Sequence, residues 1–416
     1  MADKSVLIIS FTPVGSEPRV LRQVRSFLGL GMRVTVAGYL PRPTEDVDFV
    51  DISIPQPFAG ARVFWGKLYR RLKVYGKRVA FILHIVIYSF SKKGIGGYWY
   101  NLAYRHAFAV LQKLSPVDIV VAHDWYAAPL AEKLSAQWGV PFVVDVHEYA
   151  RQQNVVKEGI LARIRHYLSW GAPQDAVHRC AYPKSLGISC VCDGIAELLY
   201  KEESLPCRPV TVRSTPFYEA QPFRECKGQI TVLYHGLFAE KRKLDVFIRA
   251  IPFCDARFHF VLRGHGENLQ SLKELAHSLG VTDRIAFEAS VPFKDIVSSA
   301  NKADVGYVVL EDFSPQHRFV LPNKFFEYIM AGLALVVSDF PEMSKLVHKY
   351  DNGRLVTSCS PRAVAQVLNS LTCEDVDSMK QRSLLAAREL CWEHEQEAML
   401  ACYGLARSER KDLFHE

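Results

Sequence analysis

The chain of 416 residues lacks any cysteine pattern that binds metal or builds a disulfide framework. It has ten cysteines, but none falls in the first 179 residues and none forms a CxxC pair. The two that lie closest together, Cys190 and Cys192, are one residue apart, which is not the spacing of a zinc site. We therefore expect reduced, mostly buried thiols in a cytosolic protein.

Long hydrophobic runs are also missing. No stretch reaches the roughly 18 apolar residues that a membrane-spanning helix needs, and the start of the chain, MADKSVLIISFTPVG, is too short in its apolar part for a signal peptide. Low-complexity tracts and short repeats are absent, so disordered and fibrous classes are excluded. With 49% hydrophobic and 23% charged residues, the composition predicts a soluble globular protein of two or three domains.

Acidic residues are missing from one long window. Between Asp51 and Asp118 there is no acid, while the window holds eleven basic residues. Outside this window the acidic residues outnumber the basic ones, so the excess positive charge behind the net charge of +7 lies within the window. A local positive field of this kind indicates an anionic partner.

Within this window, residues 61–79 have the pattern of an amphipathic helix. Aromatic and aliphatic residues fall on one face and seven Lys or Arg residues on the other, which is typical of a helix that lies on a membrane surface. An amphipathic helix packed on the protein core is the alternative. Nucleic acid is a poor fit, because stacking aromatics are not spaced between the basic residues. We expect peripheral binding to an anionic membrane on the cytoplasmic side, and hence a lipid-linked or glycan acceptor.

Strand-like and helix-like segments alternate along the chain and restart in its second half. Apolar runs such as SVLIISF, VDIVVAHD, QITVLYHG and FHFVLRGHG are typical of parallel strands covered on both faces. This pattern predicts two Rossmann-like, doubly wound α/β domains that face each other across a cleft, followed by C-terminal helices. The predicted boundaries are residues 1–204 with a basic amphipathic insert at 56–105, residues 205–385, and a helical segment at 386–416.

The motifs at the predicted strand ends resemble those of family 4 glycosyltransferases, which have the GT-B fold. The similarity is carried by GSEPRVLRQ, DIVVAHDWYAAPLA, VVDVHEYA and VCDGIAELL in the first half, and by YHGLFAEKRKLDVFIRA, VLRGHGE, ADVGYVVLE and LPNKFFEYIMAGLALVVSDFPE in the second. It spans roughly residues 5–360. The resemblance implies retaining transfer of a sugar from a nucleotide-diphosphate donor, without a bound metal. No Asp-x-Asp arrangement is placed to hold one.

In the second half, the resemblance implies that Arg242 contacts the donor phosphates, with Lys241 and Lys243 as neighbouring alternatives. Gly236, Arg263, Gly264 and Gly266 lie at strand ends, where a ligand can approach the backbone closely. A solvated basic run and simple turn glycines are the alternative interpretations.

Glu327 is the residue that the resemblance implies for the ribose hydroxyls, since a carboxylate can accept hydrogen bonds from two adjacent hydroxyls. Asn323 and Lys324 precede it, near the expected phosphates. The family usually has a second Glu eight residues earlier, where this chain has Phe319. Asp312, Ser314 and His317 are nearby candidates to replace it.

In the first half, the resemblance implies a place for His123 and Asp124 beside the reacting centre, with a buried structural histidine as the alternative for His123. His147 and Glu148 form a second pair, with a role in the acceptor site or in structure. Gly15 corresponds to a loop near the diphosphate. Glu17 and Arg19 also match a recurrent pattern, but their roles are not fixed by it. An epimerase acting on nucleotide sugars and a non-catalytic binding protein are the competing functions.

Overall fold

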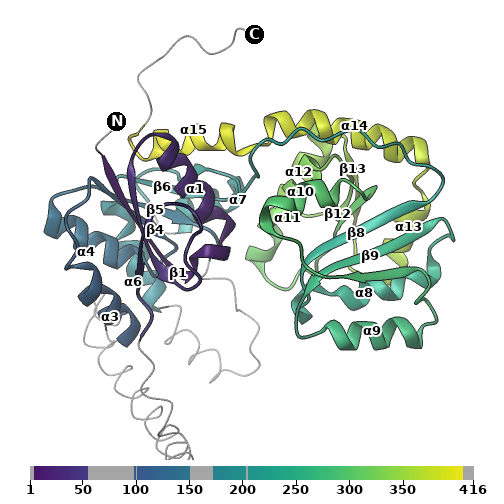
Figure 1. Cartoon of the computed structure of the whole chain (residues 1–416), viewed down its shortest axis with the longest axis horizontal. Helices are drawn as coiled ribbons and strands as arrows, with labels where there is room; N and C mark the ends of the chain where they lie inside the picture. Colours follow the sequence, from purple (N-terminus) through teal and green to yellow (C-terminus); the bar gives the residue numbers. More distant parts are fainter. Residues whose placement is uncertain (1–3, 55–97, 100, 150–171, 203–204, 406–416) are drawn as a thin grey trace, which may run out of the picture. The chain divides into compact units, whose positions relative to one another are not determined.

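The computed structural model describes residues 4–54, 98–99, 101–149, 172–202 and 205–405. The chain divides into two compact units. The N-terminal unit comprises Met1–Cys190, Ile195–Thr211 and Met399–Glu416, and the C-terminal unit comprises Val191–Gly194 and Val212–Ala398. Each is built around its own parallel sheet (Figure 1).

The N-terminal unit has a sheet of seven parallel strands within its described residues, in the order β3-β2-β1-β4-β5-β6-β7. The strands are β1 (Ser5–Pro13), β2 (Arg33–Tyr39), β3 (Asp48–Asp51), β4 (Ile119–His123), β5 (Phe142–Val146), β6 (Gly187–Cys190) and β7 (Val210–Thr211). The helices that accompany them are α1 (Pro18–Gly29), α3 (Leu102–Leu111), α4 (Ala128–Trp138), α6 (Ala172–Cys180) and α7 (Asp193–Glu202).

Helix α1 shows how local sequence sets these elements. Pro18 occupies its first position, and the Glu17 side chain accepts a hydrogen bond from the backbone N–H of Arg19. The helix ends at Gly29, and Gly31 follows in the left-handed region with a φ of 74°. This start places the Arg19 side chain inside the unit, where it is 1% exposed.

The C-terminal unit has six parallel strands in the order β10-β9-β8-β11-β12-β13 within its described residues. The strands are β8 (Ile230–Leu237), β9 (Phe258–His265), β10 (Ile285–Glu288), β11 (Val305–Val308), β12 (Ala334–Ser338) and β13 (Gly353–Val356). The helices are α8 (Leu244–Ala250), α9 (Leu269–Ser278), α10 (Ile296–Ala300), α11 (Asn323–Met330), α12 (Pro341–Tyr350), α13 (Pro361–Asn369) and α14 (Cys373–Glu389). Helices α8 and α9 lie on one side of the sheet, and α10, α11 and α12 lie on the other (Figure 1).

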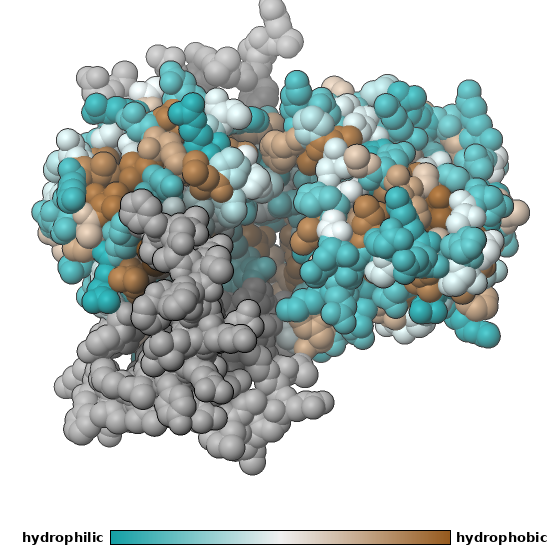
Figure 2. All heavy atoms as spheres, turned by 60° about the horizontal axis from the view of Figure 1, so that its bottom comes forward, coloured by the Kyte–Doolittle hydropathy of each residue, from teal (hydrophilic) through white to brown (hydrophobic). Residues whose placement is uncertain are grey.

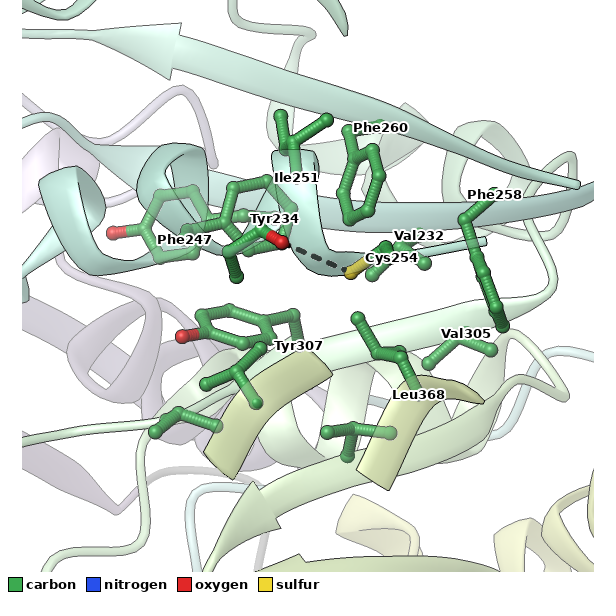
Figure 3. Packing of buried hydrophobic residues seen from close by; sticks show 14 of the residues in the cluster. Val232, Tyr234, Phe247, Ile251, Cys254, Phe258, Phe260, Val305, Tyr307 and Leu368 are labelled. Atoms are coloured by element: carbon green, nitrogen blue, oxygen red, sulfur yellow. Dashed lines mark hydrogen bonds between the residues drawn. The ribbon is translucent and has the colours of Figure 1, made fainter. Parts of the chain in front are cut away.

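The core of the C-terminal unit lies between strands β8, β9 and β11 and helices α8 and α13 (Figure 3). The Phe247 ring contacts those of Phe260 and Tyr307, with ring centroids 5.3 and 4.5 Å apart. Each such side chain contributes about 1.5–3 kcal/mol when it is fully buried. The face of this unit visible in Figure 2 is mainly hydrophilic, with hydrophobic residues scattered over it.

The predicted pair of doubly wound α/β domains is confirmed by these two sheets. The last helical region contains a break. Helix α14 ends at Glu389 and α15 (Trp392–Cys402) begins after a break, because the Trp392 N–H donates to the carbonyl of Pro216 at 2.7 Å. The predicted amphipathic segment at 61–79 lies outside the described residues. In the part of the chain that the structure describes, no helix is long and apolar enough to cross a bilayer.

Candidate functional site

The carboxyl end of β8 and the start of α11 bring positive charge together in the C-terminal unit. Lys324, in the first turn of α11, places Nζ 3.6 Å from the ring centroid of Tyr234. A Cβ added at Gly236 would lie 3.1 Å from the same Nζ. Burial and the nearby charge of Arg242 lower the pKa of Lys324 well below its usual range, while Glu327 acts in the opposite direction. The positive charge of Arg242 is therefore close enough to disfavour the charged form of Lys324.

The three adjacent cations before α8 have different surroundings. Lys243 forms an ion pair with Glu311 at 2.9 Å, and Lys241 lies over the ring of Phe313. Arg242 forms no ion pair with any described residue, and its charge acts on Lys324. Of the three, Arg242 is the one whose charge acts on Lys324.

Glu327 is buried and forms a close pair with a histidine. It is 6% exposed, and its Oε2 lies 2.8 Å from Nε2 of His235 on β8. The next residue of α11, Tyr328, accepts a hydrogen bond at its hydroxyl from the His235 backbone N–H at 2.9 Å. The sequence did not point to His235 or Tyr328. The structure makes them the partners that orient α11 against the end of β8.

Gly264 and Gly266 have packing reasons of their own. A Cβ at Gly264 would lie 1.9 Å from the carbonyl oxygen of Gly236, and one at Gly266 would lie 2.4 Å from that of Phe238. Gly236, Gly264 and Gly266 all have positive φ. The close approach of the backbone at the end of β8 therefore requires that Gly264 and Gly266 have no side chain, independently of any ligand.

Arg263 and Gly15, two further predicted site residues, also make contacts within the protein. Arg263 is buried and pairs with Glu288 through Nε at 2.7 Å, while its Nη1 has no hydrogen-bond partner among the described residues. In the N-terminal unit, the Gly15 N–H donates to the carbonyl of Pro41 at 2.8 Å, and a Cβ on Gly15 would collide with the Arg42 carbonyl. Asn323 is the first residue of α11.

The missing carboxylate at Phe319 is not replaced by a free acid in the preceding loop. Asp312 pairs with Arg318, Ser314 caps the short helix that follows it, and Nδ1 of His317 lies 2.8 Å from the Glu311 carbonyl oxygen. Phe319 itself packs against Gly194, where an added Cβ would come within 2.1 Å of its ring. All three candidates therefore have local partners.

In the N-terminal unit, the ends of β4 and β5 bring two histidines into contact. His123 Nδ1 lies 2.8 Å from His147 Nε2, and the rings meet edge to face. Asp124, with a φ of 62°, accepts hydrogen bonds from the Tyr126 hydroxyl and from the His147 backbone N–H. Among the described residues, Nε2 of His123 is buried without a partner. His123, Asp124 and His147 thus form one cluster.

Beneath this cluster lies a buried ion pair that the sequence analysis missed. Arg19 donates through Nε and Nη2 to the two oxygens of Asp145, at 2.7 and 2.6 Å. Gln23 and Ser189 add one hydrogen bond each, both at 2.6 Å. Although burial opposes ionisation, Arg19 holds the pKa of Asp145 well below its usual range. The available signal was a lone acid within the apolar strand FVVDV, which requires a buried partner.

Two separate chemical environments result. The C-terminal unit offers paired cations beside a buried carboxylate, which suits a ligand carrying both phosphates and hydroxyls. The N-terminal unit offers a buried imidazole nitrogen backed by a fixed charge network.

Comparison with known proteins gives two family matches. The model described as "Glycosyl transferase 4-like domain" matches residues 14–214, and that described as "Glycosyl transferases group 1" matches residues 229–374. The D-inositol 3-phosphate glycosyltransferase of Thermobifida fusca is 24% identical over 315 residues, which is 69% of each chain. A glycogen synthase of Mycobacterium tuberculosis is 24% identical over 283 residues, covering 65% of this chain and 64% of the relative.

Solved structures agree at the level of the fold. WaaG, a glycosyltransferase involved in lipopolysaccharide biosynthesis, has a TM-score of 0.66 at 14% identity, with 96% of this chain and 100% of that chain covered. HepE of Anabaena in complex with UDP-glucose has a TM-score of 0.64 at 12% identity, with coverage of 96% and 98%.

Proposed function

Because the chain belongs to the group 1 glycosyltransferases (family 4) and has their GT-B fold, we propose that it transfers a hexose from a nucleotide-diphosphate sugar to a membrane-associated acceptor. The observation that carries the donor half of this proposal is the convergence of Arg242, Lys324 and the buried Glu327 at the end of β8. A nucleoside diphosphate has complementary chemistry, with two charged phosphates and a ribose diol.

In this proposal Arg242 and Lys324 neutralise the diphosphate, and Asn323 at the start of α11 lies beside it. A helix N-terminus favours a bound anion, so α11 adds to the two cations. Glu327 accepts the ribose hydroxyls, and Gly236, Gly264 and Gly266 keep the floor of the site free of side chains. Protein cations thereby supply the charge that a metal supplies in other transferases.

The proposed reaction retains the configuration of the sugar and needs no enzyme nucleophile. The acceptor hydroxyl attacks on the face from which the diphosphate departs, and a phosphate oxygen takes its proton. His123 and Asp124 act beside the reacting centre, while Arg242 stabilises the leaving group. The contribution of the protein is then orientation and electrostatic stabilisation.

The nature of the acceptor is the least constrained part of the proposal. It rests on the acid-free window between Asp51 and Asp118, whose basic residues favour an anionic lipid surface. A lipid-linked sugar or another glycan at the cytoplasmic face of the membrane fits such a position.

A donor panel tests the reaction class. Incubation with a set of nucleotide sugars should release nucleoside diphosphate slowly from one of them, because water can replace the acceptor. An epimerase should instead yield an isomeric nucleotide sugar, and a non-catalytic relative should bind a donor and change nothing. Either of these two results would contradict the proposed transfer.

Glu327→Ala tests the donor site itself. Losing a hydrogen-bonded carboxylate costs about 1.5–3 kcal/mol, so calorimetry should show donor affinity reduced roughly 10- to 100-fold. Glu274→Ala, an exposed position on α9, is the matched control and should bind normally. Equal affinity in both variants would remove Glu327 from the site.

A further inference from the structure

The contact between His123 and His147 is a hydrogen bond, in which one hydrogen atom lies between the two rings. Their nitrogens, Nδ1 of His123 and Nε2 of His147, are 2.8 Å apart, which is a hydrogen-bond distance. One ring must donate and the other must accept. The choice decides which nitrogen of His123 carries its own hydrogen, and therefore what His123 presents at Nε2.

The surrounding charges place the donated hydrogen on His147. Its Nδ1 is 3.7 Å from Asp124 Oδ2, and its Nε2 is 3.5 Å from Asp145 Oδ2. His123 is 1% exposed, and its Nδ1 faces only one of these carboxylates, Asp145, at 3.6 Å. A positive imidazolium at His147 is stabilised by two acids, whereas the same charge on His123 would be more deeply buried.

We propose that His147 is a positioning residue that donates from Nε2 to Nδ1 of His123, so that His123 carries its hydrogen on Nε2 and acts as a hydrogen-bond donor rather than as a base. The Asp145–Arg19 pair fixes the strand end on which His147 lies. The inference rests on the proposed function only for its consequence in catalysis, because the tautomer itself is a property of the free protein.

The pKa values agree with this assignment. Burial opposes a charge on His147, but Asp124 and Asp145 raise its pKa to about 9. Burial and the charge of His147 lower the pKa of His123 to about 3. The charged groups that act on the pair from the neighbouring elements are Arg19, Asp124 and Asp145.

A bridging cation is the competing interpretation. Ligand atoms of His123, Asp145 and His147 lie within 4.8 Å of one another. However, each oxygen of Asp145 already accepts two hydrogen bonds, from Arg19 with Gln23 and from Arg19 with Ser189. A divalent ion there would lie beside the Arg19 guanidinium, so a shared hydrogen is the better fit.

The test is nitrogen NMR of the full chain with labelled histidine, with His123→Gln used to assign the signal. Near neutral pH, His123 should be a neutral imidazole with its hydrogen on Nε2, and His147 should be an imidazolium. His123 with its hydrogen on Nδ1 would overturn the inference even in an active transferase. Spectra that change on addition of a chelator would overturn it in favour of a bound cation.

Two variants separate positioning from a merely structural role. His147→Phe removes the donor, so His123 should occupy both tautomers and kcat should fall roughly 10- to 1000-fold, as for other groups that orient a catalytic imidazole. His147→Gln keeps an N–H at a similar reach and should restore the Nε2–H tautomer and much of kcat. His348→Gln, exposed on α12, is the control.

The outcomes also separate this inference from the proposed function. If the predicted tautomer is found in a protein that consumes no nucleotide sugar, the positioning stands and the proposed function falls. If transfer occurs but His147→Phe leaves both the tautomer and kcat unchanged, the positioning role is overturned. Should His147→Phe fail to fold, the wild-type spectrum and His147→Gln still decide the tautomer.

Discussion

Asp145 is the residue whose removal the N-terminal unit should tolerate least. It is fully buried and holds the Arg19 guanidinium through two hydrogen bonds. Asp145→Asn keeps the shape but leaves a buried cation without its counter-charge, which costs about 3–5 kcal/mol. Urea unfolding followed by tryptophan fluorescence measures this loss, because Trp99, Trp125 and Trp138 lie in the N-terminal unit.

The control for Asp145→Asn removes both charges. Arg19→Met combined with Asp145→Asn leaves no unpaired ion in the core, so the double variant should be more stable than Asp145→Asn alone. If the two variants unfold at the same urea concentration, the ion pair is not the cause of the loss.

The pKa of Lys324 should rise when a nucleoside diphosphate binds. Burial and Arg242 lower its pKa in the unliganded site, and the negative charge of a bound diphosphate opposes that effect by favouring the ammonium form. Calorimetry repeated across alkaline pH in buffers of different ionisation enthalpy should show net proton uptake over the range between the pKa of Lys324 in the free protein and its pKa in the complex. Lys324→Met should bind more weakly without proton uptake, and a buffer-independent enthalpy in the native protein would contradict this account.

At the scale of single residues, the sequence predicted those candidate site residues that belong to a local sequence pattern. Glu327 was chosen because it lies in a short motif that resembles the family pattern, and the structure shows that it is buried. The partner of Asp145 could not be found in this way, since Arg19 lies 126 residues earlier in the chain. The tautomer of His123 likewise depends on His147, whose contact exists only after β4 and β5 pair.

At the scale of elements, the close approach of β8 and β9 makes Gly264 irreplaceable. A Cβ there would lie 1.9 Å from the Gly236 carbonyl oxygen, so Gly264→Ala must push the two strand ends apart. Beyond the backbone strain, overpacking of this kind costs about 1–3 kcal/mol. Hydrogen exchange should be faster in the β8 and β9 peptides of the variant.

Gly280→Ala is the matched comparison for Gly264→Ala. Gly280 also has a positive φ, of 65°, but nothing lies within 4 Å of the added Cβ. Its cost should be limited to the backbone term of about 1–2 kcal/mol and should not reach β8 and β9. Equal exchange rates in β8 for the two variants would show that the strand contact is not limiting.

Element types followed from periodicity, but some element ends did not. The buried runs of β1, β4 and β8 and the apolar face of α1 were readable because each is encoded within a few residues. The break between α14 and α15 was not, since it depends on the hydrogen bond from Trp392 to Pro216. A contact between residues so far apart in the chain cannot be predicted from the local sequence pattern.

At the scale of the whole molecule, the repeated strand-helix alternation was sufficient to predict two doubly wound sheets. It could not show how the chain divides between them. The C-terminal residues from Met399 return to the N-terminal unit, where the Tyr403 hydroxyl lies 3.1 Å from that of Ser189, 214 residues earlier. Assignments of this kind depend on tertiary contacts.

The charge distribution of the whole chain makes a prediction about membranes. Four basic residues of the acid-free window, Arg70, Arg71, Lys77 and Arg78, are proposed to face anionic lipid. Each contributes about 1 kcal/mol near such a surface, so reversing all four should weaken co-sedimentation with phosphatidylserine vesicles by at least about 1000-fold. The binding of the native protein should also fall with added salt.

The control for this experiment is a second variant with the same net charge as the first. Reversing Lys201, Lys273, Lys302 and Lys349, which are exposed outside the window, changes the total charge by the same amount. If membrane binding depends on the local field, this variant should sediment with vesicles nearly as well as the native chain. If both sets weaken binding equally, the attraction comes from total charge and the window has no special role. If neither does, the amphipathic segment packs on the protein, and the acceptor need not be lipid-linked.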